Sequence, residues 1–185
     1  MKKLLVGALI AALAAGCGST EELRAEREAN PAPCPNIIVL EEAARFIEFS
    51  GEETLQDIAY TGEVVDVGSA CRYFSDEPIE MELSIDLAFG RGPKADQSEK
   101  IFKYFVAVTR TNTEVIAKSE FAVPVEWDGD EAVAVQRVEV DEILIPRASD
   151  QVSGVNFEIV VGFAVTPQQA IYNRSGKSLK FPDIK

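Results

Sequence analysis

The sequence contains no histidine, and it is poor in basic residues, with 18 Lys and Arg against 31 Asp and Glu. Without histidine the chain cannot build a Ser-His-Asp triad, a Cys-His dyad or a histidine-ligated zinc site. The formal net charge of −13 repels the phosphate backbone, so we expect no nucleic-acid partner. The length of 185 residues, 46% of them hydrophobic, suits one domain with a real core rather than two.

The N-terminal apolar run is too short for a stable membrane span. Lys2 and Lys3 precede an apolar stretch from residue 4 to residue 15. As a helix this stretch would measure about 18 Å, against roughly 30 Å for the hydrocarbon core of a bilayer. We therefore expect residues 1–16 to be a signal peptide.

This segment ends in Leu13-Ala14-Ala15-Gly16-Cys17. Small residues before a cysteine resemble the lipobox of bacterial lipoprotein precursors, with Ala14 at the position usually held by leucine. The resemblance implies that Cys17 is lipidated and becomes the acylated N-terminus after cleavage. Lipoproteins of this family carry several acyl chains, which is enough for stable anchoring. Gly18 follows the cysteine where an Asp would favour the inner membrane, so the resemblance implies the outer membrane.

An ordinary secretory signal, cut after an Ala-x-Ala sequence, is the alternative, and it would leave a stray thiol at Cys17. Cleavage before Cys17 removes Lys2 and Lys3 and no acidic residue, so the net charge changes from −13 to −15. Since no basic patch remains to meet anionic lipid, we expect the domain to be held at the membrane by its lipid alone.

The other two cysteines, Cys34 and Cys71, form an even pair in an exported chain, which indicates a disulfide bond. The bond would close a loop of about 38 residues and stabilise the fold by roughly 4 kcal/mol in the chain-entropy model. It would join a lipidated N-terminus and tether, residues 17–33, to a periplasmic β domain, residues 34–185. Two free thiols or a redox pair are the alternative, which the missing Cys-x-x-Cys motif disfavours.

Alternation of apolar and polar residues dominates the chain beyond the tether. In residues 79–89 every odd position is large and apolar, which places one face of a strand on a core. Residues 157–165 repeat the pattern with a more apolar second face, so we expect that strand to be central. Further strand-like runs are 37–40, 59–67, 102–108, 115–127 and 133–145, the last with two phase slips that suggest bulges or a strand that bends between sheets.

Turn residues and prolines divide these runs. Asp128-Gly129 is typical of a hairpin turn, and Pro124 and Pro146 indicate an edge strand or a strand end. Phe74 and Phe105 depart from the local alternation, so we expect them to be exposed.

Roughly seven to nine short strands with no long helix indicate an all-β fold: an antiparallel two-layer sandwich of immunoglobulin-like or fibronectin-like type. A closed β-barrel is the alternative. Residues 41–49 mix helix and strand signals, and the tail after Gln168 is interpreted as partly irregular.

The sequence offers few candidates for catalysis or metal binding. Asp128, Asp130 and Glu131 are close together, but the spaced ligands of a calcium loop are missing, so we interpret them as a solvated hairpin tip. Glu80 and Glu82 belong to the outward face of their strand. We therefore predict no catalytic residues, no metal ligands, no cofactor and no enzymatic activity.

Together these expectations describe a lipoprotein anchored in the outer membrane, with its domain in the periplasm. We expect it to act as a non-enzymatic binding or assembly module for an envelope protein complex, through loops or an exposed sheet edge. The sequence does not reveal the binding residues. The second hypothesis is a barrel that carries a lipid or a small apolar ligand, and the third is an enzyme with carboxylates clustered in a cleft.

Overall fold

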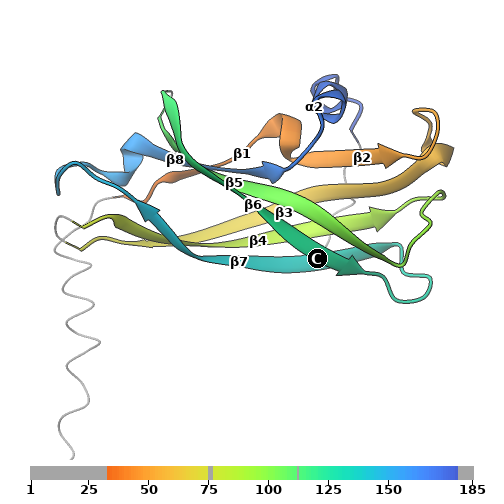
Figure 1. The fold of residues 1–185 in the computed structure, drawn as a ribbon, viewed down its shortest axis with the longest axis horizontal. Helices are drawn as coiled ribbons and strands as arrows, with labels where there is room; N and C mark the ends of the chain where they lie inside the picture. Colours follow the sequence, from red (N-terminus) through yellow and green to blue (C-terminus); the bar gives the residue numbers. More distant parts are fainter. Residues whose placement is uncertain (1–32, 75–76, 112, 179–185) are drawn as a thin grey trace, which may run out of the picture. The chain divides into compact units, whose positions relative to one another are not determined.

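The computed structural model describes residues 33–74, 77–111 and 113–178. Its elements, in chain order, are β1 (Asn36–Val39), η1 (Glu41–Ala43), β2 (Arg45–Phe49), η2 (Leu55–Asp57), β3 (Ile58–Arg72), β4 (Ile79–Arg91), β5 (Glu99–Arg110), β6 (Glu114–Glu126), β7 (Val133–Ile145), η3 (Gly154–Asn156), β8 (Phe157–Phe163) and α2 (Pro167–Arg174). The strands form two four-stranded sheets with the orders β1-β8-β5-β6 and β2-β3-β4-β7, packed face to face (Figure 1). The predicted all-β two-layer sandwich is confirmed, and the described strands do not close into a barrel.

The alternating pattern builds the core between the sheets. In β4 the odd residues from 79 to 89 are at most 3% exposed. Aromatic rings fill the centre: Phe89 stacks on Phe102 with 4.8 Å between ring centroids, and Phe46 meets Phe163 edge-on at 4.9 Å. Such ring pairs add to the free energy gained by burying their apolar surface.

The two apolar faces of β8 are explained by its position. β8 lies between β1 and β5, as its sequence predicted for a central strand. It pairs in parallel with β1 and antiparallel with β5. The short strand β1 therefore lies at the edge of its sheet and begins at Asn36, separated from Cys34 by Pro35 alone.

The predicted phase of β7 is partly wrong. The pairing with β4 shifts register once, where Met81 pairs with Ile143 but Leu83 pairs with Val140, so β7 has one bulge and not two. Before this bulge the core-facing phase includes Ala134, whereas Val135 is 48% exposed. Because 133–135 reads Val-Ala-Val, both phases are apolar there, and alternation alone does not identify the inner face.

Phe105 is also placed differently from the prediction, since it is only 8% exposed. It lies on the outer face of its sheet and forms a small second cluster with Ala43 and Ala107. The ammonium of Lys118 lies 4.5 Å from the centre of its ring. Phe74 is half-buried.

The tail that was expected to be partly irregular contains the helix α2. Thr166 and Gln169 form a reciprocal capping box at its start, with proline in the first turn. Asn173 fastens the helix to the rest of the domain, because its Nδ2 donates to the backbone oxygens of Glu42 at 2.8 Å and Arg45 at 2.6 Å.

Most of the remaining local predictions agree with the structure, but the hairpin predicted at Asp128-Gly129 is wrong, because β6 and β7 belong to different sheets and do not pair. Segment 41–49, which carried both signals, is a 3₁₀ turn followed by the strand β2. Pro124 lies in β6, an edge strand, and Pro146 directly follows the end of β7. Gly129 lies between β6 and β7 with a φ of 52°, a left-handed conformation that glycine adopts without strain.

Candidate functional site: the disulfide corner and the exposed faces

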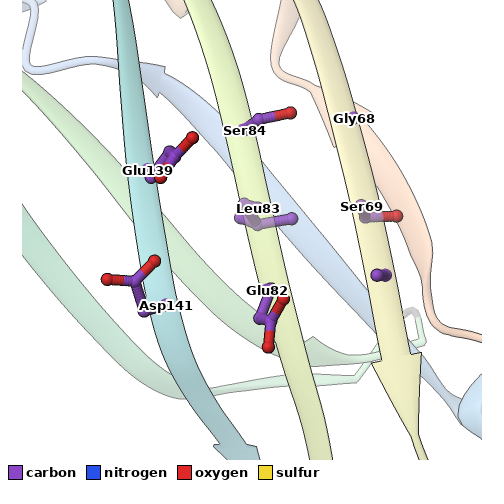
Figure 2. Close-up of a pocket in the computed structure, with 8 residues that line it drawn as sticks. Gly68, Ser69, Glu82, Leu83, Ser84, Glu139 and Asp141 are labelled. Atoms are coloured by element: carbon purple, nitrogen blue, oxygen red, sulfur yellow. The ribbon is translucent and has the colours of Figure 1, made fainter.

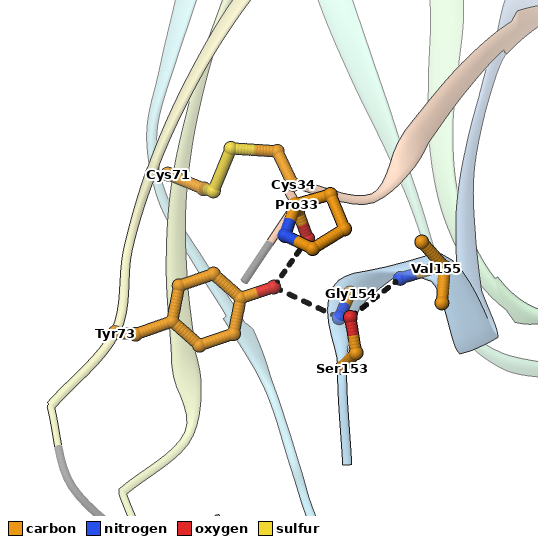
Figure 3. The surroundings of a disulfide bond; sticks show 7 residues. All are labelled: Pro33, Cys34, Cys71, Tyr73, Ser153, Gly154 and Val155. Atoms are coloured by element: carbon orange, nitrogen blue, oxygen red, sulfur yellow. Dashed lines mark hydrogen bonds between the residues drawn. A yellow bond between two sulfur atoms is a disulfide. The ribbon is translucent and has the colours of Figure 1, made fainter. Parts of the chain in front are cut away.

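Cys34 and Cys71 form a disulfide bond, as predicted, with 5.8 Å between their Cα atoms (Figure 3). Cys34 precedes β1 of one sheet, and Cys71 lies near the end of β3 in the other. The bond therefore links the two layers of the sandwich at the point where the described chain begins. We call this region, with Pro33, Tyr73 and Gly154, the disulfide corner.

The hydroxyl of Tyr73 connects three segments at the disulfide corner (Figure 3). It donates to the backbone oxygen of Pro33 at 2.6 Å and accepts from the backbone N–H of Gly154 at 2.8 Å. The guanidinium of Arg147 lies 5.2 Å from the centre of the tyrosine ring. A cation over a ring face adds a favourable electrostatic contact.

Gly154 is required at the disulfide corner by close approach. A Cβ atom at this position would lie 2.4 Å from both the Pro33 oxygen and the Tyr73 hydroxyl oxygen. A larger residue at position 154 would therefore displace the Pro33 carbonyl and the Tyr73 hydroxyl, and it would disrupt the hydrogen bonds of that hydroxyl.

The sequence predicted the two cysteines of this corner, but its alternation gave no indication of Tyr73, Arg147 or Gly154. Their contacts join positions 40 to 81 residues apart, and alternation reports only on neighbours. The proximity of Tyr73 to Cys71 in the sequence was the one available signal.

A shallow hollow on the outer face of the sheet β2-β3-β4-β7 is acidic. Figure 2 shows the carboxylates of Glu82 on β4 and of Glu139 and Asp141 on β7, beside the small residues Gly68 and Ser84. Glu82 pairs with Arg72 on β3. The outward position predicted for Glu82 is thus confirmed, and its charge is used in a cross-strand ion pair.

A second cross-strand pair on this face shifts two pKa values. Arg137 donates two hydrogen bonds of 2.7 Å to the carboxylate of Asp86. These bonds lower the pKa of Asp86 and raise that of Arg137, because each stabilises the charged form of its partner. Burial raises the pKa of Tyr104, which belongs to the core and not to a surface site.

The acidic turn 128–131 is exposed, but the predicted hairpin tip is wrong, because the turn connects β6 of one sheet to β7 of the other. The backbone N–H of Glu131 donates to the oxygen of Asp128 at 2.9 Å, and Arg91 donates to the oxygen of Gly129 at 3.2 Å. Within the described part of the chain, His, Cys, Asp and Glu side chains form no group of three or more able to hold a metal ion.

The outer face of the sheet β1-β8-β5-β6 carries an apolar groove of about 610 Å³. Leu40, Ala43 and Phe105 belong to its apolar lining, and Leu40 is 39% exposed. Ion pairs lie along its rim, Glu42 with Arg174 at 3.1 Å and Lys118 with Glu120 at 3.3 Å.

The pKa of Glu42 is lowered by a hydrogen bond that its carboxylate accepts from its own backbone N–H and by its pairing with Arg174. Apolar and charged side chains thus line the groove together, and Leu40 is the most exposed of the three apolar residues named.

A smaller cleft of about 180 Å³ separates β6 from β7 at the open side of the sandwich. Its lining includes Ala117 and Ser119 of β6 and Ile143 and Leu144 of β7, and Leu144 is 52% exposed. Because the side chains of Ala117 and Ser119 are small, they leave the space between the two sheets unfilled at this point.

Comparison of the chain with protein-family models, with curated proteins and with solved structures finds no match. Cys17, the predicted lipidation site, lies outside the described residues. Within those residues, no helix is long and apolar enough to cross a membrane.

Proposed function

We propose that this protein is a lipoprotein of the bacterial outer membrane, anchored through Cys17, whose periplasmic domain is a non-enzymatic binding module for an envelope protein complex. The observation that carries the proposal is the disulfide corner. A tether attached to lipid at Cys17 would reach the domain at Pro33, where Tyr73 and the Cys34–Cys71 bond hold the chain.

The position of the disulfide bond suits an anchored domain. A pull on the tether would otherwise act on β1, a strand of four residues at a sheet edge. The bond passes the pull to β3, a strand of 15 residues that pairs with β4 along nearly its whole length, including Cys71 opposite Met81. An anchored module that engages a partner needs such a connection, because its two attachments pull in different directions.

Binding is favoured over catalysis by the exposed faces. The groove at Leu40 and Phe105 joins apolar surface to charged margins, which fits a protein partner. A carrier of lipid or of a small apolar ligand needs an interior cavity, but Phe46, Phe89 and Phe102 occupy the centre of this sandwich. We therefore do not favour the carrier hypothesis.

Fractionation of cells that express the full chain tests the anchor. We expect wild-type protein to incorporate a palmitate analogue and to sediment with outer membranes, and Cys17→Ser to lose both properties. The matched control is the double variant Cys34→Ser/Cys71→Ser, which should remain labelled and membrane-bound. Unlabelled wild-type protein would contradict the proposal.

Binding is tested by affinity purification of the lipidated protein from envelopes after chemical cross-linking. We expect a defined envelope protein whose yield falls when Leu40→Glu places a charge in the groove. The matched control is Leu55→Glu, because Leu55 is 69% exposed and does not line the groove. Equal yields from wild type and Leu40→Glu would argue against this surface.

A further inference from the structure

β6 is a long strand with an unpaired edge. It pairs with β5 only and ends its sheet among the described strands. The other edge strands are protected in different ways: β1 and β2 have four and five residues, and β7 has a bulge that carries Asp141 and Glu142. β6 pairs regularly with β5 from the register shift at Ile116 as far as Pro124. An open, regular edge of this kind is a template for another strand.

The hydrogen-bonding phase of this edge follows from the neighbouring strand. The backbone N–H of Trp127 donates to the oxygen of Ser98 at 2.9 Å, which continues the β6–β5 ladder. Hydrogen-bonded positions alternate along an antiparallel strand. The backbone N–H and C=O groups of the odd residues of β6 therefore bond to β5, and those of the even residues point away from β5, toward the open edge of the sheet. The outward positions are Lys118, Glu120 and Ala122, followed by Pro124, which has no N–H to offer.

In one register, the charged residues among these positions are complementary between two copies of β6. Two copies of β6 that meet antiparallel across a two-fold axis pair even residues with even residues, so the axis passes through a residue. An axis through Ser119 sets Lys118 of each copy opposite Glu120 of the other. An axis through Lys118 or Glu120 sets like charges opposite each other, which is unfavourable.

We propose that two copies of this protein associate through β6, antiparallel, with the two-fold axis at Ser119. The pairing extends the sheet β1-β8-β5-β6 into a continuous eight-stranded sheet with about four central main-chain hydrogen bonds. Two Lys118–Glu120 pairs between the copies fix the register. This association does not require the lipid anchor.

The cleft beside β6 supports the same arrangement. Ala117 and Ser119 belong to the inner phase of β6, yet they remain exposed because the opposite sheet does not cover them. In the proposed register Phe121 of the second copy lies opposite Ala117 and adds apolar surface at the cleft. The short length of the contact predicts weak association, which confinement to a membrane surface would strengthen.

Symmetric disulfide trapping tests the register. The variant Ser119→Cys, made in a Cys17→Ser background so that no other free thiol is present, should form a covalent dimer under mild oxidation. At the axis the two Cα atoms lie about 4.5 Å apart, within the range for a disulfide bond. The matched control is Ala117→Cys, whose symmetry-related Cα atoms lie about 14 Å apart. We expect at least tenfold faster trapping at position 119.

Charge reversal tests the partner pairs. In sedimentation at low salt, Lys118→Glu and Glu120→Lys should each weaken dimerisation of the full chain about five- to thirtyfold, and the double variant should restore it. Circular dichroism should be unchanged, because both side chains are exposed. Equal trapping at positions 117 and 119, or a monomer at all concentrations, would overturn the proposal. A monomer that binds a different protein along β6 would also overturn it.

Discussion

Gly154 and Tyr73 set the geometry of the disulfide corner at the scale of single residues. The Tyr73 hydroxyl both donates to Pro33 and accepts from the Gly154 N–H, so all its bonds depend on the backbone approaching closely. Only a residue without a side chain permits that approach. The addition of a single methyl group at position 154 should therefore disturb the disulfide corner, although it adds no charge and removes no contact.

We predict that Gly154→Ala destabilises the protein by about 1–3 kcal/mol, the usual cost of forcing an extra methyl group into a packed site. Urea unfolding measures the change. Gly68→Ala is the matched control, because the added Cβ would meet only the hydroxyl of Ser84, which is free to rotate away. If both variants unfold at the wild-type urea concentration, the corner is less closely packed than described.

The pair of Asp86 and Arg137 gives a prediction for acid stability. Hydrogen bonds from Arg137 lower the pKa of Asp86 in the folded state. A carboxylate with a lowered folded-state pKa stabilises the fold fully above its unfolded value of about 3.9, and this contribution is lost as the pH falls through the folded-state value.

We therefore expect Arg137→Ala to raise the pKa of the Asp86 carboxyl toward the ordinary aspartate value and to remove this part of the acid dependence. NMR titration of the carboxyl carbon measures the pKa directly. Arg137→Lys keeps the charge but not the paired hydrogen bonds. In this variant the pKa of Asp86 should lie between its pKa in wild type and its pKa in Arg137→Ala. An identical titration in wild type and Arg137→Ala would contradict the assignment.

At the scale of elements, α2 is too short to be stable through helix propensity alone, so the capping box at its start contributes to its stability. It has eight residues, a length at which an isolated helix is marginal in water. The Thr166 side chain accepts from the N–H of Gln169, and the Gln169 side chain accepts from the N–H of Thr166.

We predict that Thr166→Ala weakens α2 by about 0.5–2 kcal/mol while the sheets remain intact. Hydrogen exchange should show faster exchange of the α2 amides and unchanged exchange in β4, because local opening does not require global unfolding. Gln168→Ala is the control, since this side chain is exposed and takes no part in the cap. Faster exchange throughout the sheets in Thr166→Ala would count against a local role.

The elements also show how far the sequence predicted the fold. Strand β4 was predicted over nearly its full length, because one face is large and apolar and the other is polar. The phase of β7 was wrong where Val133 and Val135 flank Ala134, since alternation has no contrast there. The helix α2 was missed although Thr166 and Gln169 formed a readable cap, because its face gives little apolar periodicity.

The candidate surfaces were less predictable than the strands. The disulfide followed from counting cysteines, but Tyr73 and Gly154 meet only after the two sheets pack. Phe105 was expected in solvent because its phase faces outward, and the 3₁₀ turn η1 that covers it approaches from a distant part of the chain. Long-range packing, and not local pattern, decides which outward residues are buried.

At the scale of the whole molecule, the Cys34–Cys71 bond is a covalent cross-link between the two sheets, in addition to the chain connections that pass from one sheet to the other. The segment that it closes, residues 35–70, contains β1, β2 and most of β3, with members in both layers. In the unfolded protein the bond restricts this segment, which lowers the entropy gained on unfolding. The bond also keeps β1 beside β8, where only four residue pairs hold it.

We predict that reduction of the bond lowers the melting temperature by roughly 8–15 °C, which corresponds to about 4 kcal/mol for a chain of this size. Calorimetry with and without reductant measures the shift. Cys34→Ser should reproduce the lower value and should not respond further to reductant, whereas wild type should recover after reoxidation. The loss should appear first at β1, as faster hydrogen exchange of Ile38 and Val39, because these residues have lost their covalent link to β3. Equal melting of oxidised and reduced wild-type protein would mean that packing alone joins the layers, and the argument that the corner transmits a pull from the tether would fail with it.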